Sequence, residues 1–93
     1  MKLDPDLRLK IYEIVGVYAK RFSIIEPKVL LTTREVLDMP REITEGARTS
    51  AYKYLGLSYN GQNLIFINTR KISDEKDLEN TIVHELSIKD FHI

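Results

Sequence analysis

Apolar residues recur at steps of three and four along the N-terminal part of the chain, with charged residues between them. This is the spacing of one face of an amphipathic α-helix. Asp4-Pro5-Asp6 precedes the stripe and is typical of a helix start, because Asp4 can accept a bond from an N-terminal amide and proline is tolerated in the first turn. We therefore predict a long helix over about residues 5–22. Its apolar stripe consists of Leu7, Ile11, Ile14, Val15, Tyr18 and Phe22.

After this helix the pattern changes to short apolar runs. Pro27 excludes a helix interior, and the β-favouring run that follows it predicts a strand at about 28–32. Thr33 is expected to cap a short helix over 34–39. The next run, residues 40–50, has no clear period. A plain surface connector is favoured there over a loop that borders a substrate groove.

Two apolar runs flank Asn60-Gly61, a dipeptide that tolerates positive φ and is typical of a tight β-hairpin turn. The sequence predicts antiparallel strands at about 51–59 and 62–68. Because residues 64–67 are all apolar, we expect both faces of the second strand to be covered. With the earlier strand, the hairpin predicts a three-stranded, mainly antiparallel sheet.

A second amphipathic helix is predicted near the C-terminal end. Ser73 is its expected N-cap, and the acidic residues that follow would interact favourably with the positive end of the helix dipole. Leu78, Ile82 and Leu86 then recur at four-residue steps and predict the buried stripe. We expect this helix to fray around 87–90.

His84 and Glu85 lie next to each other within this predicted helix. Neither belongs to the stripe of four-residue steps, and His84 is expected on another flank, in line with Thr81 and Ile88. Replacing either His84 or Glu85 is therefore expected to change stability by no more than about 0.5 kcal/mol, as at ordinary surface positions.

Together these elements predict an α+β protein with a long N-terminal helix, a sheet that ends in a hairpin, and a C-terminal helix. The 93 residues, 43% hydrophobic and 30% charged, suit a single domain that spans 1–93. No apolar run approaches the roughly 18 residues of a membrane span, and Asp4 and Asp6 occupy the place of a signal peptide's apolar region. We expect a cytoplasmic protein without a membrane partner. Many Ile, Lys, Glu and Tyr residues beside no Cys suit a thermophile.

The net charge is zero, but the charges are unevenly distributed along the chain. Residues 1–22 have five basic and three acidic groups, whereas residues 72–93 have two and six. The acidic C-terminal segment argues against a broad phosphate-binding face. A nucleic-acid binder would instead use the basic N-terminal helix and base-stacking tyrosines of the hairpin. Packing of half-buried strands, with the tyrosines at a partly exposed rim, explains these residues more simply. The residues concerned are Arg8, Lys10, Lys20, Arg21, Tyr52, Tyr54 and Tyr59.

The segment DLENTIVHEL, which follows the hairpin strand LIFIN, resembles the metal-binding helix of the minimal zincin domain. Zincins are zinc metallopeptidases, and the likeness is to small SprT-like proteins and related archaeal or phage proteins. It covers about residues 50–87, and the N-terminal helix only in outline. The resemblance implies a helix packed on a sheet, a metal helix against it, and a peptide substrate along an edge strand. It assigns His84 as a zinc ligand and Glu85 as the general base that takes a proton from zinc-bound water.

The chain departs from the family pattern at position 88. A second His is required four residues after the first, but the chain has Ile88 there, and it offers no later segment for a third ligand. His92 lies about 12 Å beyond His84 along a continuous helix, so both rings cannot bind one ion. Without Cys, any zinc site must use His, carboxylates and water. An altered or truncated reading frame, a member retained for binding, and a site completed between chains all stay open.

Three classes of function follow from these observations. The first is a zinc metallopeptidase-like protein with an incomplete site, expected to be inactive as this 93-residue chain. The second is a non-catalytic module of the same shape that binds a protein, a peptide or another copy of itself through an open sheet edge. The third is a nucleic-acid binder, against which the zero net charge and the absence of a recognised motif count.

Overall fold

The structure is a computed structural model that describes residues 1–44, 53–59 and 62–91. Three features named above lie outside these ranges: Tyr52, His92 and the predicted hairpin turn at Asn60-Gly61.

The first helix, α1 (Pro5–Arg21), agrees with its prediction. Asp4 is the N-cap, and its Oδ1 accepts a hydrogen bond of 2.8 Å from the Leu7 amide. Ile11, Val15 and Ala19 are buried, while the other members of the predicted stripe pack at the margin of the core.

Three short strands form one sheet in the order β1-β3-β2. They are β1 (Lys28–Leu30), β2 (Gly56–Ser58) and β3 (Leu64–Ile67). The hairpin prediction is confirmed by the antiparallel pairing of β2 with β3, although both strands are shorter than expected. β1 instead pairs with β3 in parallel, so the sheet is mixed rather than mainly antiparallel. Apolar periodicity marks strand positions but contains no information on strand direction.

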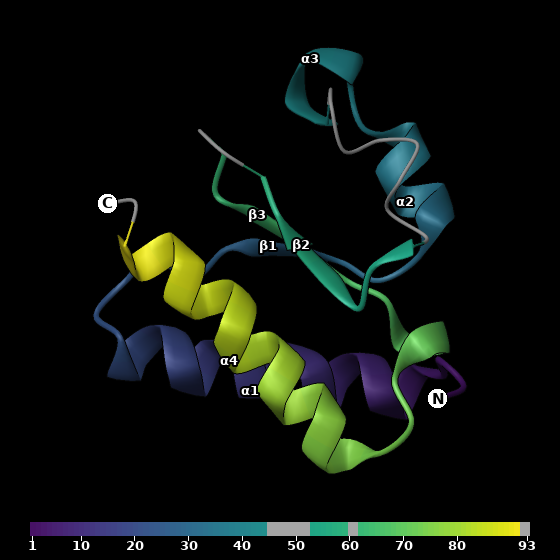
Figure 1. Ribbon diagram of the computed structural model, residues 1–93, viewed down its shortest axis with the longest axis horizontal. Coiled ribbons are helices and arrows are strands. Elements are labelled where there is room, and N and C mark those ends of the chain that lie inside the picture. Colours follow the sequence, from purple (N-terminus) through teal and green to yellow (C-terminus); the bar gives the residue numbers. More distant parts are fainter. Residues whose placement is uncertain (45–52, 60–61, 92–93) are drawn as a thin grey trace.

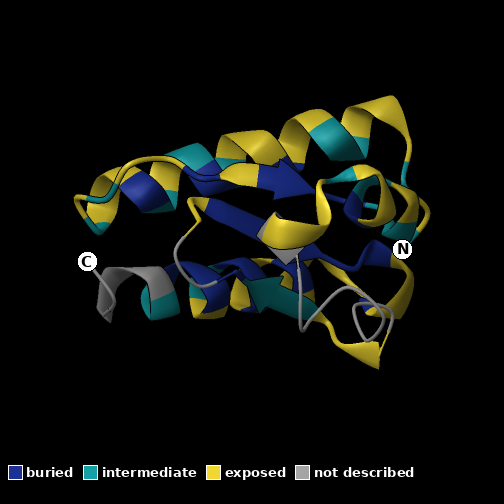
Figure 2. Cartoon of the chain, turned by 90° about the horizontal axis from the view of Figure 1, so that it is seen from above, coloured by how far each residue is buried: buried dark blue, intermediate teal, exposed yellow. Residues whose placement is uncertain are grey.

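The sheet lies between two helical layers (Figure 1). α1 and α4 (Glu75–Phe91) lie on one side, and α2 (Thr33–Asp38) lies on the other. Alternate residues of β3 contribute to two clusters, since Ile65 and Ile67 pack with α1 and α4, and Leu64 and Phe66 pack on the α2 side. All four residues of β3 are buried, which confirms the prediction that both faces are covered (Figure 2).

The remaining elements connect these layers. The cap of α2 is Thr32, one residue before the predicted Thr33, and its Oγ1 accepts from the Glu35 amide at 3.0 Å. A one-turn helix, α3 (Arg41–Thr44), begins the expected connector. A 3₁₀ turn, η2 (Thr69–Lys71), leads from β3 toward α4.

The last helix, α4, begins and ends later than predicted. Asp74 accepts from the Asp77 amide at 2.9 Å and caps the helix, so Ser73 is not the N-cap. The helix continues to Phe91, which makes the expected fraying around 87–90 wrong. α4 contacts both α1 and β2, and packing of this kind rather than intrinsic propensity supplies most helix stability. Within the described ranges, no helix combines the length and apolar character needed to cross a membrane.

Candidate active site

Glu85 is buried where α4 passes the edge strand β2. Its side chain is only 5% exposed, and Ser58 Oγ lies 3.0 Å from its Oε1 and 2.9 Å from its backbone carbonyl oxygen. The expectation that Glu85 lies off the buried face is therefore wrong. Glu85 follows Ile82 by three residues and Leu78 by seven, which is also the spacing of one helix face. The apolar pattern does not include this buried position, because Glu85 is charged.

Gly56 makes room for the Glu85 side chain. A Cβ atom at position 56 would lie 3.0 Å from Glu85 Cγ, 3.1 Å from its Oε2 and 3.1 Å from the carbonyl oxygen of Phe66. Sequence reasoning missed both Gly56 and Ser58 as parts of the site. Glycine inside a strand often marks the close approach of another group, so Gly56 could have indicated this site from the sequence. Ser58 has no comparable feature in the sequence.

His84 has different surroundings from its neighbour. It is exposed on the outer side of α4, as predicted, whereas Glu85 faces β2. Ile88 lies one turn further along the helix and is half-buried. The structure thus brings Glu85 to the sheet edge and leaves His84 on the adjacent flank.

The described residues do not fit a zinc ion. Zinc sites in proteins use at least three side-chain ligands, and Ile88 has no atom that could serve as one. In the part of the chain that the structure describes, no three His, Cys, Asp or Glu side chains gather to hold a metal ion. His84 is the one imidazole in these ranges, because His92 lies outside them.

The backbone of β2 presents hydrogen-bonding groups at the sheet edge. The Tyr59 amide donates to the Leu64 carbonyl at 3.2 Å, and the Asn68 amide donates to the Leu55 carbonyl at 2.8 Å. In an antiparallel pair, alternate residues bond to the partner strand. The amide and carbonyl groups of Gly56 and Ser58 are therefore directed away from β3, on the side where an additional strand would pair.

Three of the four basic residues of α1 contact another side chain, and the fourth, Lys20, is exposed. Arg8 and Lys10 are paired with carboxylates, and Arg21 lies over an aromatic ring at 4.9 Å from its centroid. Charges already paired in this way are less available to phosphate groups, which weakens the nucleic-acid interpretation. The respective partners of Arg8, Lys10 and Arg21 are Glu35, Glu75 and Tyr18.

One of the hairpin tyrosines, Tyr59, offers little surface for base stacking. Tyr59 is 4% exposed, which contradicts its expected place at a partly exposed rim, and its burial raises the pKa of its hydroxyl above the ordinary value of 10.0. Tyr54 is 50% exposed and agrees with the expectation. The burial of Tyr59 therefore agrees with packing within the sheet, the simpler of the two interpretations, rather than with base stacking.

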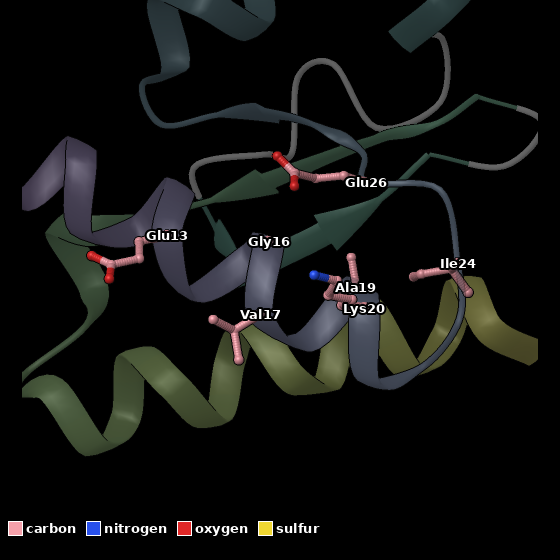
Figure 3. Close-up of a pocket in the computed structure, with 7 residues that line it drawn as sticks. All are labelled: Glu13, Gly16, Val17, Ala19, Lys20, Ile24 and Glu26. Atoms are coloured by element: carbon pink, nitrogen blue, oxygen red, sulfur yellow. The ribbon is translucent and has the colours of Figure 1, made fainter.

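A concave surface lies on α1, in a different part of the fold from Glu85. It is an open groove of about 470 Å³ between the helix and the segment that leads to β1 (Figure 3). Val17, Ile24 and Glu26 contribute to its lining, and a Cβ atom at Gly16 would lie 3.0 Å from Glu26 Oε1. Close packing against Glu26 therefore accounts for the glycine at position 16.

Comparison with known proteins gave no match to a protein-family model, to a curated protein or to a solved structure.

Proposed function

We propose that this chain is a zinc metallopeptidase-like domain of the zincin type with an incomplete metal site. The observation that supports the proposal is the place of Glu85, a carboxylate buried between α4 and the edge strand β2 and adjacent in sequence to an exposed imidazole. A general base needs a carboxylate held in one position near the substrate strand. In this proposal Glu85 occupies the place of that base, and His84 the place of the first zinc ligand.

No hydrolytic step follows for the chain as it is, because Ile88 occupies the place of the second zinc ligand. A single imidazole does not hold zinc in the manner of a peptidase site. We therefore expect no peptidase activity from this chain unless ligands come from residues outside the described ranges or from another molecule. Its partner would be a protein or peptide in extended conformation.

The proposal is tested by restoring an imidazole at position 88. Ile88→His places two imidazoles four residues apart on one helix flank, the spacing that two ligands of one zinc ion require. We expect this variant to bind one zinc ion per chain at least ten times more tightly than the unaltered chain. Titration against a chromophoric chelator of known zinc affinity measures the difference.

A matched control distinguishes a built site from any pair of imidazoles on a helix. Asn80→His also creates a pair four residues apart with His84, but position 80 is exposed. Zinc affinity should be higher in Ile88→His than in Asn80→His, and Glu85→Gln should reduce that advantage by removing a nearby negative charge. Equal affinities in the two His variants would contradict the proposed site.

A second candidate function is a non-catalytic module that binds an extended segment along β2. The outward direction of the Gly56 and Ser58 backbone groups favours it, since strand addition uses such groups. If the segment comes from another copy of the chain, amide hydrogen exchange at these two residues should slow as protein concentration rises. Size-exclusion chromatography over the same range should show the dimer. Exchange that is independent of concentration, with a constant elution volume, would exclude self-association at this edge.

A further inference from the structure

We infer that Ser58 is the positioning residue of this site, because its hydroxyl holds the Glu85 carboxylate in one orientation against β2. The inference rests on the proposed function, in which Glu85 occupies the place of a zincin's general base. Ser58 and Glu85 are 27 residues apart in the sequence, so the fold brings them together.

The contact involves both the side chain and the main chain of Glu85. Ser58 Oγ is 3.0 Å from Glu85 Oε1 and 2.9 Å from the Glu85 carbonyl oxygen. A hydroxyl has one proton to donate, so these two acceptors share one donor. The shared donor fixes the position of α4 relative to β2 and the direction of the carboxylate at the same time.

Gly56 completes this arrangement from the same side of the strand. Residues 56 and 58 project toward one face of β2, and both approach Glu85. The absent side chain at Gly56 admits the Glu85 Cγ atom, and the Ser58 hydroxyl then determines where the carboxylate lies. In this proposal, Gly56 leaves space for the Glu85 side chain, and Ser58 orients its carboxylate.

Ser58 also connects this carboxylate to the β2 edge of the sheet. Its backbone amide and carbonyl point away from β3, while its hydroxyl contacts Glu85. An extended peptide that pairs with β2 would therefore bond to the residue that orients Glu85. In this proposal, peptide docking and orientation of the carboxylate are linked through Ser58.

The test measures the Glu85 side-chain rotamer by NMR three-bond couplings in Ser58→Ala and Ser58→Thr. In the unaltered protein, the Glu85 coupling constants should have the limiting values of a single staggered χ1 rotamer. In Ser58→Ala they should shift toward the values averaged over the three staggered rotamers. Ser58→Thr retains a hydroxyl and should restore the limiting values. The backbone shifts of α4 should stay within the native pattern, which separates positioning from a general loss of structure.

A control serine tests whether any lost hydroxyl has this effect. Ser87 lies on the same helix, and its hydroxyl donates to the Val83 carbonyl at 2.8 Å, so Ser87→Ala should leave the Glu85 couplings unchanged. If Ser58→Ala does not fold, Ser58→Cys has a weaker donor of similar shape and should show intermediate averaging.

Two results would overturn the inference. One is a single Glu85 rotamer in both Ser58→Ala and Ser58→Cys. The other is equal averaging in Ser58→Ala and Ser58→Thr, which would mean that packing rather than the hydroxyl orients Glu85. Neither result depends on zinc. Failure of the inference is therefore distinguishable from failure of the proposed function, which the zinc affinity of Ile88→His tests separately.

Discussion

Replacing Gly56 with alanine should destabilise the protein, although the same change usually stabilises a strand. Alanine has less conformational freedom in the unfolded chain than glycine, which contributes about 0.5–1 kcal/mol in favour of the folded state. The added Cβ would, however, lie 3.0 Å from Glu85 Cγ and 3.1 Å from the backbone oxygen of Phe66. Overpacking of this kind costs about 1–3 kcal/mol, and the backbone oxygen cannot move aside as a side-chain end can. We expect a net loss of about 1–2 kcal/mol.

The matched control is alanine at Gly16, in the interior of α1. Its Cβ would approach only Glu26 Oε1, the flexible end of an exposed side chain, at 3.0 Å. The gain in helix propensity should then dominate and stabilise the protein by about 0.5–1 kcal/mol.

Urea denaturation of the two glycine variants and the unaltered chain gives both free energies of unfolding, and the two changes should have opposite signs. The double variant Gly56→Ala/Glu85→Ala should lose less free energy of unfolding than the sum of the two single variants' losses, because truncating Glu85 removes one of the two crowded contacts. Equal stabilisation by both alanines would show that Glu85 does not lie against β2.

Two further predictions follow from burial. Glu85→Ala should lower the free energy of unfolding by about 1–3 kcal/mol, because it leaves a cavity and removes the carboxylate, one of the two acceptors of the Ser58 hydroxyl. His84→Ala should stay within about 0.5 kcal/mol. Equal losses in urea denaturation would refute the different burial of these neighbours. Burial raises the pKa of Tyr59 above 10.0, so its contribution to stability is complete below the unfolded-state pKa and decreases as pH rises through the higher folded-state value. The free energy of unfolding should therefore decrease above about pH 10, and less steeply in Tyr59→Phe; an unchanged slope in that variant would contradict this assignment.

The helices and the hairpin could be predicted because their signals are local. Asp4 and Pro5 define the start of α1, and the antiparallel pairing of β2 with β3 agrees with the predicted hairpin, although its register pairs Ser58 with Ile65 and so differs from that of a two-residue turn. Strand direction could not be predicted in the same way. The parallel pairing of β1 with β3 depends on the path of the chain through α2 and α3, which no local pattern records.

The candidate site was predicted only in part. His84 and Glu85 were found by sequence, but their different burial was not, because a carboxylate at a buried helix position interrupts the apolar pattern that identifies such positions. Ser58 could not be found at all. Its role depends on a contact across 27 residues between a strand and a helix, and serine in a strand has no distinctive signal.

The central claim, a zincin-type site that lacks ligands in this chain, is tested most directly by zinc stoichiometry. The protein is loaded with zinc, desalted and analysed for metal, with His84→Ala as the control. We predict far less than one zinc per chain and no difference in zinc content between the two proteins. One zinc per chain that is lost in His84→Ala would contradict the claim, because the site would then be complete within this chain. One zinc per two chains, also lost in the variant, would instead show a site shared between two copies.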